Sequence, residues 1–155
     1  MKIQWKELIL CIVIPLAVGG ISALLTQQSM EVFATVVKPP LSPPAWLFPV
    51  VWTILYVLMG IASYLVLQSS KPYRIRTALT FYAIQLFFNF WWSIIFFNIE
   101  AYLLAFVWIL LLWFFILITT FMFYKITKPA GYLMIPYIVW VTFAAYLNLG
   151  IYLLN

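Results

Sequence analysis

The stretch from Ala101 to Tyr124 reads AYLLAFVWILLLWFFILITTFMFY and contains no charged residue. A helix needs about 20 mostly apolar residues to cross the hydrocarbon core of a bilayer. This stretch is long enough, and it is apolar on almost every face, so we expect much of its circumference to contact lipid. We interpret its Trp108 and Trp113 as lipid-facing or packing residues rather than ligand-binding residues.

Four more stretches of 18 to 25 residues have the same apolar character, and none contains a charged residue: Leu8–Leu25, Trp46–Leu67, Thr77–Phe97 and Ala130–Leu154. Lys2 and Lys6 before the first stretch resemble the start of a signal peptide. No clear small-residue cleavage site followed by a soluble domain comes after it, so we count it as a span. The sequence therefore predicts an all-α integral membrane protein, a bundle of five transmembrane helices, in a single domain over residues 1–155.

Composition excludes several classes of function. The chain has 155 residues, of which 68% are hydrophobic and 7% charged, whereas a soluble domain has about 25% charged residues. It contains no His and no Asp, and Cys11 is its single cysteine. These absences argue against a His/Cys metal site, axial His ligation of haem and a Ser–His or Cys–His nucleophile. We expect no catalytic acid–base residue, no metal, no required cofactor and no nucleic-acid partner.

The charges predict an orientation in the lipid bilayer. Five spans place the N-terminus and the second and fourth connections on one side, which carries seven of the eight basic residues: Lys2, Lys6, Lys71, Arg74, Arg76, Lys125 and Lys128. The other side has only Lys38, with Glu31 and Glu100. Cytoplasmic loops are enriched in Lys and Arg. We therefore expect a cytoplasmic N-terminus, an outer C-terminus and, most simply, a bacterial cell membrane.

The third span carries a polar stripe. Gln85, Asn89 and Ser93 recur every four residues, so they share one helix face, and Trp92 lies near it. Amides in hydrocarbon need partners and face the bundle or a cavity. Interhelical hydrogen bonding and ligand binding explain this stripe equally well.

Two other spans present aromatic and small or polar residues at the same spacing. These are Trp52, Tyr56 and Gly60 in the second span, and Trp140, Ala144 and Asn148 in the fifth. Gly60 permits close helix approach. An aromatic stripe usually means packing, but three uncharged faces with amides favour a flat, apolar ligand held by stacking and a few hydrogen bonds.

The connection from Thr26 to Ala45 is long and rich in proline. Ser42 followed by Pro43 and Pro44 is typical of a helix start, with Ser as the N-cap. The same residues, stiffened by Pro39 and Pro40, also fit a lid over the outer mouth of the bundle. The two interpretations are compatible.

Three ordered motifs resemble the TspO/MBR family, the tryptophan-rich sensory and translocator proteins. They are KPPLSPPAWLFPVVWTILYVLMGIA (Lys38–Ala62), NFWWSIIFF (Asn89–Phe97) and PYIVWVTFAAYLN (Pro136–Asn148). The resemblance implies a five-helix bundle that binds protoporphyrin IX, haem and benzodiazepine-type ligands. It also implies light- and oxygen-dependent porphyrin breakdown in bacterial relatives, tied to the positions of Trp52 and Trp140.

The resemblance assigns further candidate residues. Asn89 and Trp92 match pocket positions, Ala144 matches a small residue whose enlargement disturbs binding, and Phe33 stands where many members have Tyr. The full set of candidate ligand-binding residues is Phe33, Pro43, Pro44, Trp46, Trp52, Tyr56, Asn89, Trp92, Trp140, Ala144 and Asn148. The chain lacks a basic residue after Lys128, so the animal-type sterol motif is absent. The third span has Ala78 and Ala83 but no small-xxx-small pair, which leaves a homodimer open.

Three functions remain after the sequence is read. The first is a membrane receptor or sensor for tetrapyrroles or other hydrophobic small molecules. The second is a small secondary transporter or exporter of such compounds. A proton-coupled transporter needs an ionisable residue in the membrane, and Glu31 and Glu100, the candidates on the outer side, lie outside the spans or at their ends. The third is a structural membrane partner of other proteins.

Overall fold

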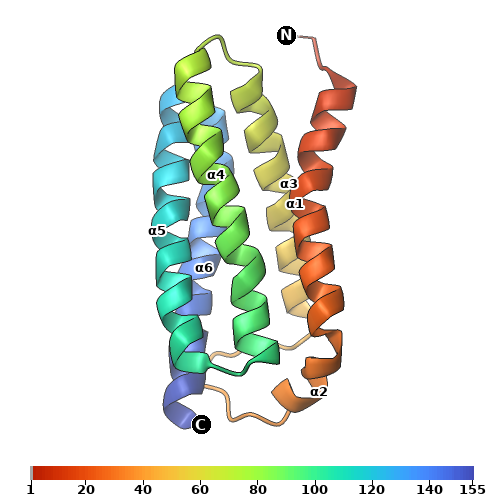
Figure 1. Ribbon diagram of the computed structural model, residues 1–155, viewed down its shortest axis with the longest axis vertical. Helices are drawn as coiled ribbons and strands as arrows, with labels where there is room; N and C mark the ends of the chain where they lie inside the picture. The colour runs from red at the N-terminus through yellow and green to blue at the C-terminus, as the bar shows by residue number, and fades with distance from the viewer. Residues whose placement is uncertain (1) are drawn as a thin grey trace.

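The computed structural model describes residues 2–155, and the regular secondary structure of this part of the chain is all helical, with no strand (Figure 1). Five of its helices are long and apolar enough to cross a membrane. They are α1 (Trp5–Thr26), α3 (Leu47–Leu67), α4 (Pro72–Ser93, continued by a π-helical turn Ile94–Asn98), α5 (Tyr102–Ile126) and α6 (Lys128–Leu154). The predicted fold class, an all-α membrane bundle of five spans, is confirmed.

The long helices run side by side along one axis, with the two chain ends at opposite ends of the bundle (Figure 1). Helix α5 packs along α4 and α6, and α3 packs along α1 and α6. Helices α3 and α4 follow each other in the chain but touch at few points. The seven basic residues named above lie in the segments at the N-terminal end of the bundle.

Close approach between α1 and α3 depends on glycine. A Cβ added at Gly60 would lie 2.5 Å from the Cα of Ile12 and 2.7 Å from the carbonyl oxygen of Cys11. Pro15 lies inside α1 and has no N–H to donate to that carbonyl. A Cβ at Gly19 would meet the ring of Tyr56. The expectation that Gly60 allows close packing is therefore confirmed.

The first connection crosses the C-terminal end of the bundle (Figure 1). It forms a 3₁₀ turn (Gln27–Ser29) and the short helix α2 (Met30–Phe33) and then runs without regular structure to α3. Pro39 packs on Gly150 of α6, and the Tyr146 hydroxyl donates a 2.7 Å hydrogen bond to the carbonyl of Pro40. Near the end of α1, where the first connection begins, the carbonyl of Leu25 accepts a 2.9 Å hydrogen bond from the side chain of Asn98.

The prediction that Ser42 caps the second span is wrong. Helix α3 begins at Leu47, with Trp46 at the cap position. The Ser42 hydroxyl donates a 2.7 Å hydrogen bond to the carbonyl of Pro39, three residues back. Serine side chains readily make such local bonds in turns, and here the bond shapes the connection instead of the helix.

Candidate ligand-binding site

The amides of the α4 stripe lie in a buried hydrogen-bond network that joins three helices. The Tyr56 hydroxyl donates to the Asn89 side-chain oxygen at 2.7 Å, and the Asn89 amide donates to the Tyr137 hydroxyl at 2.8 Å. Tyr137 in turn donates to the Gln85 side-chain oxygen at 2.6 Å. All four residues are buried. In this conformation Gln85 and Asn89 bond to tyrosines of α3 and α6, as the interhelical interpretation of the stripe requires.

A second buried group of hydrogen bonds lies nearer the first connection. The Trp92 indole N–H donates to the Asn148 side-chain oxygen at 3.0 Å, and the Asn148 amide donates to the carbonyl of Tyr102 at 2.9 Å. The Trp92 ring stacks on Phe96, with centroids 5.2 Å apart. These bonds connect α4, α6 and the start of α5, so two candidate ligand residues contact each other.

Trp52 lies beside the first network. Its ring stacks on Tyr56 with centroids 5.6 Å apart and meets Tyr137 edge-on at 6.2 Å. The side chain is half-buried. Trp52 thus contacts two of the tyrosines that hold the amides, and its ring faces the bundle at least in part.

Trp140 lines an apolar cleft between α3 and α6. The cleft has a volume of about 530 Å³ and is lined by Val51, Ile54, Leu55, Pro136, Val139, Trp140 and Phe143. Small-molecule pockets measure about 300–1,000 Å³. The indole N–H of Trp140 is buried and has no hydrogen-bond partner among residues 2–155. The hydroxyl of Tyr82, on α4, is also buried without a partner among these residues. Buried donors are nearly always paired, so an unpaired N–H on a residue that lines the cleft is an exception.

The candidate residues Phe33, Pro43, Pro44 and Trp46 are not among those that line this cleft. Phe33 packs edge-on against Phe97, with centroids 5.1 Å apart, and the ammonium group of Lys38 lies 4.7 Å above its ring. Pro43 is half-buried, and Pro44 and Trp46 are exposed. Their part in ligand binding stays a prediction.

Sequence reasoning identified some members of these sites and missed others. Ala144 is buried one turn after Trp140, and of the predicted residues Trp140 alone is among those that line the cleft. Tyr137, which bonds both amides, was not predicted, although a tyrosine directly after Pro136 in an apolar span was a signal. The aliphatic lining residues carry no pattern that separates them from lipid-facing ones.

Trp108 and Trp113 are packing residues, as predicted. The Trp108 N–H donates to the carbonyl of Phe88 at 2.8 Å, and its ring lies 4.6 Å from that of Phe88. The Trp113 N–H donates to the Thr142 hydroxyl at 2.8 Å. The two indoles thus connect α5 to α4 and to α6.

The acidic residues lie at the surface. Glu7, Glu31 and Glu100 are all exposed. Glu100 sits in the turn before α5 with a positive φ of 58°. Among residues 2–155 no three His, Cys, Asp or Glu side chains come together as metal ligands could.

Comparison with known proteins agrees with the fold and the motifs. The sequence model of the TspO/MBR family matches residues 11–154. A "Tryptophan-rich protein TspO" of Chlorobaculum tepidum is 43% identical over 100% of this chain and 99% of its own length. A "Tryptophan-rich sensory protein" of Cereibacter sphaeroides is 38% identical over 76% of this chain and 74% of its own. A "Translocator protein" of Ovis aries is 35% identical over 75% and 70%. The chain is therefore a membrane protein that belongs to the TspO/MBR family.

Proposed function

We propose that this protein is a membrane receptor for flat hydrophobic ligands of the tetrapyrrole class, such as protoporphyrin IX and haem. The observation that carries the proposal is the apolar cleft between α3 and α6, which is lined in part by Trp140, a residue whose buried indole N–H has no partner among residues 2–155. An apolar cleft lined by aromatic rings suits a guest that is flat and mostly hydrocarbon. Benzodiazepine-type ligands share that description.

The physical basis of binding is partition followed by contact. A porphyrin macrocycle is flat and apolar, so it concentrates in the bilayer. Ile54 and Val139, which line the cleft, are exposed, so a ligand can enter the cleft from the bilayer. Contacts with the Trp140 and Phe143 rings add about 0.5–1.5 kcal/mol each beyond area burial. A rotation of the Trp140 ring that exposes its buried N–H would add a hydrogen bond to a ligand carbonyl or carboxylate in a medium of low dielectric constant.

The same arrangement supports porphyrin degradation without acid–base residues. A bound porphyrin absorbs light and passes the energy to dioxygen, which then oxidises the macrocycle. Trp140, which lines the cleft, and Trp52, which stacks on Tyr56, are the oxidisable indoles for this chemistry. The light-driven step rests on ligand binding and is tested with it.

The test is a titration of the purified protein with protoporphyrin IX, followed by porphyrin fluorescence in the dark and photobleaching in the light. Trp140→Phe keeps an aromatic ring but removes the N–H, so we expect binding about tenfold weaker. Trp52→Phe should slow photobleaching. Trp91→Phe is the matched control, because Trp91 is exposed on α4, and it should behave like the wild type. Wild-type binding and bleaching in both Trp140→Phe and Trp52→Phe would remove the indoles from the function.

A further inference from the structure

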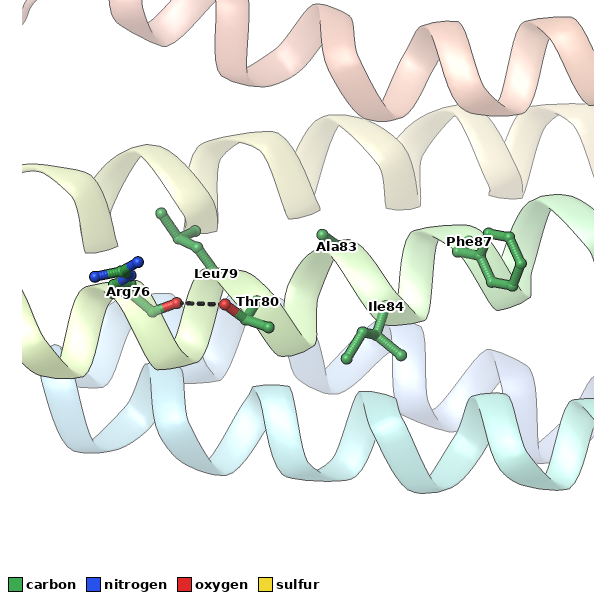
Figure 2. A pocket seen from close by; sticks show the side chains of 6 residues that line it. All are labelled: Arg76, Leu79, Thr80, Ala83, Ile84 and Phe87. Atoms are coloured by element: carbon green, nitrogen blue, oxygen red, sulfur yellow. Dashed lines mark hydrogen bonds between the residues drawn. The ribbon is translucent and has the colours of Figure 1, made fainter.

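The outer face of α4 carries a second groove, separate from the α3–α6 cleft. Figure 2 shows the side chains that line it, all from α4: Arg76, Leu79, Thr80, Ala83, Ile84 and Phe87. Their spacing of three and four residues places them on one side of the helix. The groove is open and has a volume of about 600 Å³. Its lining is apolar except at the end that holds Arg76 and Thr80.

The guanidinium of Arg76 is the polar group that the groove offers to a ligand. The Thr80 hydroxyl already donates a 2.8 Å hydrogen bond to the carbonyl of Arg76 (Figure 2). Arg76 is exposed, and its side chain makes no hydrogen bond or ion pair with any of residues 2–155. A cation with no partner thus lies at one end of an apolar surface.

The surroundings of Arg76 are basic. Six other basic residues lie in the segments at this end of the bundle, with Glu7 as the one acidic residue there. Glu7 accepts a hydrogen bond from the Gln68 amide. The ammonium of Lys71 lies 3.5 Å from the carbonyls of Lys125 and Ile126, so it is directed to the end of α5. The charge at the groove therefore favours an anion.

The length of the groove along α4 matches the thickness of one leaflet of a bilayer. Phe87 follows Arg76 by eleven positions in the sequence, which corresponds to about 16 Å along a helix. The hydrocarbon core is about 30 Å thick, so a groove that starts at the membrane surface ends near its middle. Arg76 lies in the second turn of α4, close to the exposed Tyr73, and tyrosine is enriched at membrane surfaces.

We propose that this groove binds one anionic phospholipid, with its phosphate on Arg76 and one acyl chain over Leu79, Ala83 and Phe87. Arginine pairs with phosphate through two parallel N–H···O bonds. Ala83, with the smallest side chain of the lining, leaves room for the chain at the middle of the groove. The one charged residue of the groove lies at its headgroup end, which matches the polarity of a phospholipid.

The experiment compares two lipids of equal chain length on the full-length protein. Purified protein receives equimolar palmitoyl-oleoyl phosphatidylglycerol and phosphatidylcholine, and native mass spectrometry counts the lipids that stay bound. We expect the wild type to retain phosphatidylglycerol preferentially. Arg76→Gln should reduce that preference about tenfold. Arg76→Lys keeps the charge without the paired N–H groups, so it should fall between the two.

Arg74→Gln is the matched control, because it removes the same charge two residues away and outside the groove lining. It should keep the wild-type preference. Ala83→Phe should lower the retention of both lipids, since it fills the groove. Helix content by circular dichroism and protoporphyrin IX quenching, which reports on the α3–α6 cleft, should stay at wild-type values in all four variants.

Three results would overturn the proposal. Equal losses in Arg74→Gln and Arg76→Gln would mean general surface charge rather than a site. A wild type without preference for phosphatidylglycerol would remove the headgroup contact. A shift of the monomer–dimer equilibrium in Ala83→Phe, with unchanged lipid retention, would assign the groove to a second copy of the chain.

Discussion

The Tyr56 hydroxyl donates a 2.7 Å hydrogen bond to the side chain of Asn89, and this bond joins α3 to α4 where the two helices otherwise touch little. The same amide donates to Tyr137 of α6. One asparagine therefore connects three membrane helices. The ring of Trp52 stacks on Tyr56. Asn89 therefore helps to position Trp52 through Tyr56, without contacting Trp52 itself.

Asn89→Ala should destabilise the bundle. It leaves the hydroxyl of Tyr56 without an acceptor and removes one of the two partners of Tyr137, both of them buried residues. We expect a loss of about 1–3 kcal/mol in the free energy of unfolding, measured by chemical or thermal unfolding in detergent. Gln28→Ala, which truncates an exposed amide, serves as the control and should change little. Equal stability of the two variants would contradict the role of the network.

Gly60→Ala should push α1 and α3 apart. Its Cβ would meet backbone atoms of Ile12 and Cys11 at 2.5 and 2.7 Å, and backbone cannot move aside as a side chain can. We expect a cost of about 1–3 kcal/mol. Gly20→Ala is the matched control on α1, because a Cβ there meets nothing within 4 Å; it should be neutral or gain about 0.5–1 kcal/mol. A Gly60→Ala variant as stable as wild type would refute the close contact.

Trp92 and Asn148 should be coupled energetically. A double-mutant cycle with Trp92→Phe and Asn148→Ala isolates their 3.0 Å hydrogen bond. Such bonds in membrane proteins contribute about 0.6 kcal/mol on average, and we expect a coupling of at least that size in detergent unfolding. Trp113→Phe with Asn148→Ala should be additive, because Trp113 bonds to Thr142 instead. Additivity in both cycles would argue against the Trp92 bond.

Asn155→Ala should loosen the first connection. The Asn155 side chain accepts a 3.0 Å bond from the Val37 N–H and donates a 2.8 Å bond to the Val37 carbonyl. Without these bonds, we expect hydrogen exchange at the Val37 amide to accelerate about fivefold. The Thr35 amide, bonded to the carbonyl of Val32, should keep its rate. Unchanged exchange at Val37 would mean that the connection is held by other contacts.

The five spans were predictable because a bilayer demands length and apolarity, and both are visible in sequence. The positions at which the helices begin and end were less predictable. Helix α4 begins at Pro72 rather than Thr77, since its first turns carry Arg74 and Arg76 and lie outside the apolar run. Proline at a helix start is favourable, but hydropathy does not mark it. The prediction that Ser42 caps the second span was wrong because serine is common both in local turns and at helix caps, and the sequence does not distinguish the two.

The candidate site was predictable in composition more than in geometry. A stripe of amides shows that Asn89 needs a partner, but the choice of Tyr56 and Tyr137 depends on how three helices are rotated. The orphaned N–H of Trp140 depends on the absence of an acceptor within reach, which no periodicity encodes. The groove at Arg76 depends on side chains that leave space between them, and no sequence pattern reveals such space.

The cleft that holds Trp140 has walls from the second and the last membrane spans in chain order. The other extensive contacts join spans that follow one another, α1 to α3, α4 to α5 and α5 to α6. During synthesis, hairpins can therefore assemble as each span leaves the ribosome, while the α3–α6 wall waits for the final helix. The cleft is therefore complete only after the last span has been inserted.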